Sequence, residues 1–175
     1  MQFSRTDYDN GAFWQLFTSQ WVHLNALHAA SNWIVFFITL LIFKQWIPVR
    51  LQLLTLTGGF LGVAALLIWD TQCLFYAGLS GALHGMWVGN ALLLTKDSFS
   101  HQIRSTALFF LLFVALKIVW QGSSNGSNFN LWLNIPVYLP AHAAGAAGGF
   151  LVSLAMYLAI SLGLFFTQHA HQQKK

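Results

Sequence analysis

The chain has 175 residues, of which 57% are hydrophobic and only 7% are charged, and its formal net charge is +4. Soluble domains carry about 25% charged residues, so this composition excludes a soluble protein and predicts a polytopic membrane protein embedded in the lipid bilayer. The basic residues are scattered without forming a patch, which argues against a nucleic-acid partner. Cys73 is the single cysteine, so no intrachain disulfide can form.

Five segments are apolar and long enough to cross a membrane, since a spanning helix needs about 20 largely apolar residues. In chain order they are residues 22–43, 51–69, 77–95, 105–121 and 140–166. We therefore expect an all-α membrane protein that forms a single domain over residues 1–175. Its expected parts are an outside N-terminal segment, a helical core and a cytoplasmic tail, at residues 1–21, 22–166 and 167–175.

Basic residues set the expected orientation, because Lys and Arg mark cytoplasmic loops. They flank the first connection and occupy the third, at Lys44, Arg50, Lys96 and Arg104. The alternation of the spans then predicts an outside N-terminus and a cytoplasmic C-terminus. Lys117 is an exception within the fourth span, and we expect it to snorkel from near the end of its helix.

The acidic residues exclude several kinds of membrane protein. The chain has no Glu, and its four Asp residues all lie outside the predicted spans: Asp7, Asp9, Asp70 and Asp97. The spans therefore lack the paired carboxylates of an aspartyl protease and the intramembrane carboxylate of a proton-coupled transporter. The HExxH motif of zinc proteases is also absent. His23 and His28 diverge around a helix and have no carboxylate nearby, so we expect neither a metal nor a cofactor.

The polar side chains within the spans gather toward the outer ends of the first, third and fifth spans. They are His23, Asn25, His28, Asn32, Ser80, His84 and His142. Polar groups in hydrocarbon are costly, so those that persist are candidates for function. Their common depth predicts one site. A channel or transporter would instead need polar residues along a whole helix, and we expect polarity to stop at the outer level.

Ser80 and His142 form the leading candidate pair. A serine hydroxyl is a weak nucleophile until a base accepts its proton, and His142 begins the last span at the same depth. With no carboxylate to orient the histidine, the pair would be a dyad rather than a triad. Each residue is followed by glycines at a spacing of four, which let two helices approach closely. These glycines are Gly81, Gly85 and Gly89 after Ser80, and Gly145 and Gly149 after His142. The alternative is that Ser80 is a small packing residue.

His28 and Asn32 are four residues apart, so they share one face of a helix. Uncharged donors near the outer end of a span could stabilise a developing oxyanion, and one such donor lowers the free energy of the transition state by roughly 3–4 kcal/mol. The alternative is interhelical hydrogen bonding, worth about 0.6 kcal/mol for each bond. The residues alone leave both readings open.

Three motifs, taken in order, resemble those of the rhomboid family of intramembrane serine proteases. They are H-x4-H-x3-N at His23, His28 and Asn32, G-x-S-G at residues 78–81, and H-x2-G-x3-G at His142, Gly145 and Gly149. FWQLFT, residues 13–18, also resembles the membrane-dipping loop that precedes the first motif in this family. The resemblance spans residues 13–150.

The resemblance implies a role for each of these residues. Ser80 would be the nucleophile of a serine endopeptidase and His142 its base. His28, Asn32 and a backbone N–H near Ser80 would form the oxyanion site. His84 falls where many rhomboids have a tyrosine that packs on the catalytic histidine. Supporting positions are expected at Gly78, Gly81, Gly145, Gly149, His84 and His23.

The GLSG-A-LHG variant and the small size resemble the rhombosortase branch of the family. Those enzymes act on membrane proteins that end in Gly-Gly, an apolar helix and a basic tail, a signal called GlyGly-CTERM. The resemblance implies the inner membrane of a Gram-negative bacterium, with the active site facing the periplasm.

Two features depart from the family pattern. Gln15 stands where the loop usually carries Arg, which affects how the loop is anchored. The family core has six helices, so by this count the first is absent from the sequence. The alternative function is therefore a catalytically inactive rhomboid-like protein that binds or escorts membrane helices.

Overall fold

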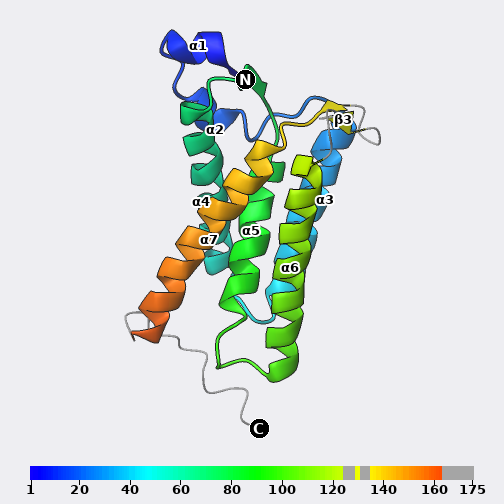
Figure 1. Ribbon diagram of the computed structural model, residues 1–175, viewed down its shortest axis with the longest axis vertical. Helices are drawn as coiled ribbons and strands as arrows, with labels where there is room; N and C mark the ends of the chain where they lie inside the picture. Colours follow the sequence, from blue (N-terminus) through cyan, green and yellow to red (C-terminus); the bar gives the residue numbers. More distant parts are fainter. Residues whose placement is uncertain (124–128, 131–134, 163–175) are drawn as a thin grey trace.

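The computed structural model describes residues 1–123, 129–130 and 135–162, and these residues are mainly helical (Figure 1). The helices are α1 (Arg5–Asp9), α2 (Gln15–Thr18), α3 (Ala26–Phe43), α4 (Val49–Trp69), α5 (Ser80–Leu93), α6 (His101–Ser123) and α7 (Pro140–Ser161). The strands are β1 (Phe3–Ser4), β2 (Phe75–Tyr76), β3 (Phe129–Asn130) and β4 (Ile135–Pro136). β1 pairs with β2 and β3 pairs with β4, both antiparallel.

Four of the described helices are long and apolar enough to cross a membrane: α3, α4, α6 and α7. The predicted span 77–95 is wrong in its length, because α5 has only 14 residues. At 1.5 Å per residue such a helix is about 21 Å long, shorter than the roughly 30 Å of bilayer hydrocarbon. It begins at Ser80 because Gly78 has a φ of 128°, which no right-handed helix accommodates.

The start of α3 also differs from the predicted span 22–43. The Asn25 side chain caps this helix, and its Oδ1 accepts a hydrogen bond from the backbone N–H of His28 at 2.7 Å. α3 therefore begins at Ala26, and His23 lies before the helix rather than in it.

The other predicted spans match helices closely. Residues 51–69 and 105–121 lie within α4 and α6, and α7 begins at the predicted position. The end of the predicted span 140–166, beyond residue 162, and the tail 167–175 lie outside the described residues.

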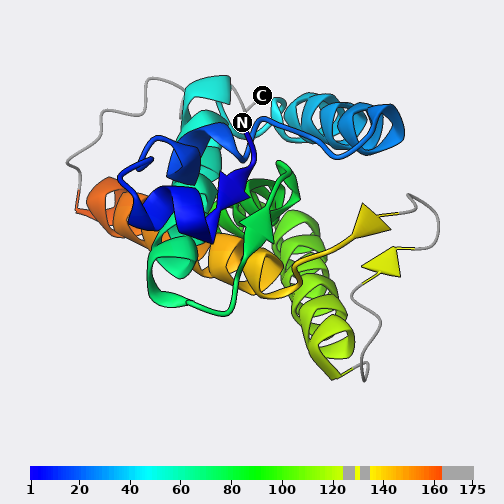
Figure 2. The same ribbon diagram turned by 90° about the horizontal axis from the view of Figure 1, so that it is seen from above.

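α5 lies at the centre of the bundle, with α4 and α7 packed directly against it (Figures 1 and 2). α3 and α6 flank α5 on its other side (Figure 2). An apolar cavity of about 560 Å³ lies between α3, α5 and α6 and is lined by large side chains such as Phe43, Trp87 and Phe110. The end of the bundle where α5 and α7 begin is called the outer end below, and the opposite end is called the inner end.

Glycines let α4, α5 and α7 pack backbone against backbone. A Cβ added to Gly145 would meet the carbonyl oxygen of Gly81, and one added to Gly149 would meet that of Gly85. The predicted contact between the two glycine series is therefore confirmed. The glycines of α4 that join this contact are Gly58, Gly59 and Gly62.

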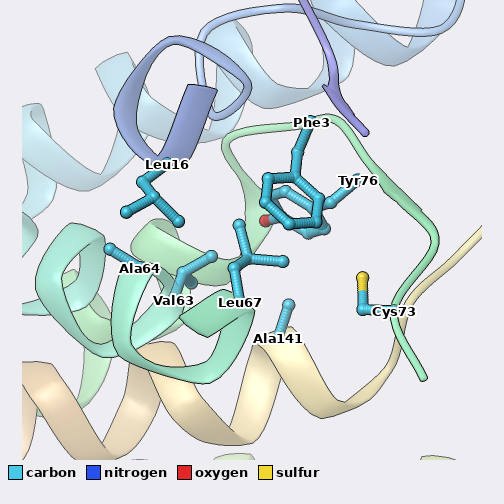
Figure 3. Packing of buried hydrophobic residues seen from close by; sticks show 8 residues of the cluster. All are labelled: Phe3, Leu16, Val63, Ala64, Leu67, Cys73, Tyr76 and Ala141. Carbon is cyan, nitrogen blue, oxygen red and sulfur yellow. The ribbon is translucent and has the colours of Figure 1, made fainter. Parts of the chain in front are cut away.

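The N-terminal residues cover the outer end of α4 (Figure 3). Phe3 is fully buried and packs beside Tyr76 in a cluster of apolar side chains. Arg5 donates hydrogen bonds to the carbonyl oxygens of Leu67 and Asp70 at the end of α4. This segment thus forms packed structure and holds β2, the strand that leads to the start of α5.

A polar cluster joins α4 and α5 toward the inner end, and we call it the inner cluster. Thr55 Oγ1 donates to Asn90 Oδ1 at 3.0 Å, and Asn90 Nδ2 donates to Gln52 Oε1 at 3.3 Å. Gln52 Nε2 in turn donates to the carbonyl oxygen of Ile47 at 3.0 Å. The three side chains are fully buried. The expectation that polarity stops at the outer level is therefore wrong.

Candidate active site

Ser80 and His142 approach each other at the outer end of the bundle. Ser80 is the first residue of α5, and His142 lies in the first turn of α7. Ser80 Oγ lies 3.1 Å from Nε2 of His142, within hydrogen-bond distance. Ser80 is half-buried, whereas His142 is buried. Gly81 permits this approach, because a Cβ there would lie 2.9 Å from the carbonyl oxygen of Ala141.

Two side chains of α6 join this pair, and neither was predicted from the sequence to belong to a site. Gln121 Oε1 lies 3.1 Å from Nδ1 of His142, and Lys117 Nζ lies 3.2 Å from the same Oε1. Lys117 therefore faces the protein, and the snorkelling prediction is wrong. The available signal was the spacing of four residues, which places both polar side chains on one face of an apolar helix.

His84 lies one turn after Ser80 and stacks on His142. The two ring centroids are 4.2 Å apart, and the ring planes are inclined by 16°. Nδ1 of His84 lies 2.7 Å from the carbonyl oxygen of Ser80, and its Nε2 lies 2.8 Å from Nζ of Lys117. Both ring nitrogens are thus engaged by groups other than the Ser80 hydroxyl.

His28 and Asn32 lie beside Gly78, two residues before Ser80. Both side chains are buried, and Nδ1 of His28 and Nδ2 of Asn32 have no hydrogen-bond partner among the described residues. Buried polar atoms are normally paired, so two unpaired nitrogens on neighbouring turns of α3 call for an explanation. His28 and Asn32 thus place polar atoms that could bind a ligand next to the start of α5.

Gly78 shapes the backbone between these groups. Its φ of 128° strains any residue with a side chain, and a Cβ there would lie 2.8 Å from Cε1 of His28. Its N–H donates to the carbonyl oxygen of Ser19 at 3.0 Å, and its own carbonyl accepts from the Tyr76 hydroxyl at 2.8 Å. Burial raises the pKa of Tyr76, so this hydroxyl stays protonated and can donate.

His23 lies in the loop before α3 and contacts His28, a residue of the site. Their ring centroids are 5.0 Å apart in an edge-to-face contact. Burial lowers the pKa of His23, while a hydrogen bond with the backbone of Trp21 raises it, and the lowering is the larger effect. A neutral His23 therefore packs against His28 at neutral pH.

Residues 13–18, which include the short helix α2, have two different sides. The apolar side chains of Phe13, Trp14 and Phe17 are exposed. Gln15 is buried, and its Oε1 accepts from the backbone N–H of Ser4 at 2.9 Å. Its Nε2 donates to Asp7 at 3.2 Å. Gln15 thus anchors this segment to the N-terminal residues.

The chemistry of the site rests on hydroxyl, imidazole, amide and ammonium groups. Within residues 1–123, 129–130 and 135–162, no three His, Cys, Asp or Glu side chains gather where they could hold a metal ion. We call the group around Ser80 the outer cluster; its members are His28, Asn32, Ser80, His84, Lys117, Gln121 and His142.

The apolar helices define an integral membrane protein, and comparison with known proteins adds its family. The family model for the Rhomboid domain matches residues 10–159, which include the whole outer cluster. The chain therefore belongs to the rhomboid family. Members of this family are generally intramembrane serine proteases that act on transmembrane substrates. No curated protein and no solved structure matches the chain.

Proposed function

We propose that the protein is an intramembrane serine endopeptidase in which Ser80 is the nucleophile and His142 the general base. The observation that carries this proposal is the 3.1 Å distance between Ser80 Oγ and His142 Nε2. The two residues are 62 positions apart in the chain, and they meet in a family whose members are generally serine proteases.

The proposed reaction follows from this geometry. Ser80 Oγ attacks the carbonyl carbon of the scissile peptide, and His142 Nε2 accepts the hydroxyl proton as the C–O bond forms. The C–N bond then breaks, and the imidazolium gives its proton to the leaving amine. Water, deprotonated by His142, attacks the acyl-enzyme and releases the second product with Ser80 restored.

The oxyanion formed by this attack is assigned to His28 and Asn32. Nε2 of His28 and the orphaned Nδ2 of Asn32 lie 3.0 and 4.0 Å from the position that a Cβ at Gly78 would occupy. A donor aimed at a developing oxyanion is usually one of the largest contributions to catalysis. Gly78, Gly81, Gly145 and Gly149 support the site by allowing close backbone approach, and His84 supports it by stacking on the base.

The proposed substrates are membrane proteins with a transmembrane anchor, and specifically those that end in Gly-Gly, an apolar helix and a basic tail. A helical peptide bond hides its carbonyl in a hydrogen bond, so the substrate must unwind before attack. Gly-Gly favours unwinding because glycine is costly in a helix. This preference follows from the rhombosortase-like sequence of the G-x-S-G region.

The proposed location is a bacterial inner membrane with the outer end facing the periplasm. Lys44, Arg50, Lys96 and Arg104 lie in or beside the connections at the inner end, as expected for a cytoplasmic side. Residues 1–175 would act as one membrane domain, in which α5 is a fifth membrane-embedded helix enclosed by the four longer ones.

A fluorophosphonate probe tests the catalytic pair in the full-length protein in membranes. We expect labelling of the wild type on Ser80, and loss of labelling in Ser80→Ala and His142→Ala. Ser153→Ala is the matched control, because Ser153 is a buried α7 serine whose hydroxyl donates to the carbonyl oxygen of Gly149 at 2.6 Å. Equal labelling of the wild type and Ser80→Ala would contradict the proposal.

A second measurement tests the substrate class. A reporter anchored by Gly-Gly, an apolar helix and a basic tail should be cleaved, and a Leu-Leu version of the same reporter should persist. Mass spectrometry of the released product distinguishes a free carboxylate from an acyl group transferred to another nucleophile. Binding of the reporter without labelling or cleavage would favour the alternative of an inactive protein that escorts membrane helices.

A further inference from the structure

We infer that Lys117 and Gln121 are positioning residues that together set the tautomer of His142 needed for it to act as a base. This inference rests on the proposed roles of Ser80 and His142. Each of the two α6 side chains contacts an imidazole ring rather than the Ser80 hydroxyl, so each would act through the base.

The first step is the orientation of the Gln121 amide. A lysine ammonium has three donors and no acceptor. Lys117 Nζ lies 3.2 Å from the end of the Gln121 side chain, so the amide must turn its oxygen toward Lys117 rather than its NH2 group. The cation thereby fixes which end of the amide faces the interior of the site.

The second step is the proton on His142. The same Oε1 of Gln121 lies 3.1 Å from Nδ1 of His142, and an amide oxygen can only accept a hydrogen bond. Nδ1 must therefore carry the proton. In a neutral imidazole this leaves the lone pair on Nε2, which faces Ser80 Oγ at 3.1 Å. The other tautomer would set a lone pair against Oε1 and an N–H against Ser80, and could not take the serine proton.

The third step is His84, which the same cation orients. Lys117 Nζ donates to Nε2 of His84 at 2.8 Å, so the His84 proton resides on Nδ1 and is donated to the carbonyl oxygen of Ser80 at 2.7 Å. His84 therefore has no free lone pair to offer Ser80 Oγ. One cation thus specifies the proton positions of both stacked rings, and it leaves His142 as the sole base for the serine.

Two titratable groups of the described residues face His142: His84 on α5 and Lys117 on α6. An added carboxylate at position 121 would therefore be the dominant negative charge beside the ring, and its effect on protonation of His142 can be read from a pH profile.

Four substitutions separate the steps, and all are made in the full-length protein in lipid nanodiscs. Gln121→Leu removes the acceptor at similar size, while Gln121→Glu retains it. Lys117→Met removes the cation, while Lys117→Arg retains it. Gln102→Leu is the matched control, because it makes the same change at an exposed position on the same helix.

The first readout is the tautomer itself, measured from ¹⁵N chemical shifts of labelled histidines, with the His142 signals identified by their loss in His142→Ala. We expect Nδ1 to be protonated in the wild type, Gln121→Glu, Lys117→Arg and Gln102→Leu. We expect a mixture of tautomers in Gln121→Leu and Lys117→Met. This measurement does not depend on Ser80 being a nucleophile, so it distinguishes failure of the inference from failure of the proposed function.

The second readout is the rate of fluorophosphonate labelling as a function of pH. Gln121→Leu should lower the maximal rate about 10- to 100-fold, as expected for loss of an orienting partner. Gln121→Glu should restore the rate and move the acid limb of the profile to higher pH, because a carboxylate beside Nδ1 favours the protonated ring. A structural role alone would not move this limb.

One pattern overturns the inference. If Gln121→Leu and Lys117→Met match Gln102→Leu in both the His142 tautomer and the labelling rate, then the two α6 side chains do not position the base. A lower rate that is accompanied by an unchanged tautomer overturns it equally.

Discussion

The outer and inner clusters are both polar groups buried among apolar helices, yet they are organised differently. In the inner cluster, Gln52, Thr55 and Asn90 are fully buried, and each finds a partner within the protein. In the outer cluster, Ser80 is half-buried, and His28 and Asn32 keep unpartnered nitrogens among the described residues. A cluster that closes on itself stabilises the fold, whereas one that leaves groups unpaired is available for a ligand.

Asn32→Leu should give the largest effect on activity. It tests whether the unpartnered polar groups of the outer cluster serve the reaction. We expect the fluorophosphonate labelling rate to fall by about 10²–10³-fold, the usual effect of removing one oxyanion donor. The midpoint of thermal unfolding, followed by fluorescence of the eight tryptophans, should barely move because Nδ2 makes no hydrogen bond to the described residues. A normal rate would remove Asn32 from the proposed oxyanion site.

Gly145→Ala should give an intermediate effect on activity. It changes the contact of α5 with α7, which carries the outer cluster, and not the contact of α4 with α5, which carries the inner cluster. The added Cβ would meet the Gly81 carbonyl oxygen, so α5 and α7 must move apart at a cost of about 1–3 kcal/mol. Labelling should fall because Ser80 and His142 sit on these two helices, while the inner cluster joins α4 to α5. Gly122→Ala is the control, because an added Cβ would meet no atom within 4 Å among the described residues beyond its own stretch of helix. It should leave both the labelling rate and the unfolding midpoint near those of the wild type.

Asn90→Leu should give the smallest effect and is the counterpart of Asn32→Leu in the inner cluster. It removes the donor to Gln52 Oε1 and one acceptor of the Thr55 hydroxyl, which still donates to the backbone carbonyl of Gln52 at 2.7 Å. Interhelical hydrogen bonds in membranes are worth about 0.6–1.7 kcal/mol. We expect a lower unfolding midpoint with an unchanged labelling rate per folded molecule. A loss of rate at full stability would mean that the inner cluster also serves the reaction.

The sequence predicted the parts of the molecule that depend on composition and on local motifs. Apolar runs located the four long helices, because burial in lipid requires about 20 apolar residues whatever the fold. The glycine series predicted the contact of α5 with α7, because close helix packing needs small residues. The Ser80–His142 pairing was predicted from depth and motif, and the two side chains lie within hydrogen-bond distance.

Other parts could not be predicted, for physical reasons. α6 has no continuous polar stripe, and the two polar side chains that share a face, Lys117 and Gln121, identify no partner by themselves, so their roles in the site were missed. The pairing of β1 with β2 involves two residues on each strand, too few to show any alternation. The inner cluster was missed because Gln52 and Asn90 come together only through packing of α4 on α5.

The glycine contacts also bear on how the bundle can move. Where carbonyl oxygens of one helix rest against the Cα atoms of another, no side chains lie between them to absorb a sliding motion, so α4, α5 and α7 should behave as one stiff block. α3 and α6 instead border a cavity with bulky, rotatable side chains. Thermal breathing of the bundle should therefore be concentrated in these two helices. Because α6 carries Gln121, a displacement of α6 would change the distance between Gln121 Oε1 and Nδ1 of His142. The hydrogen bond that holds the His142 ring would therefore vary with the position of a helix that faces lipid.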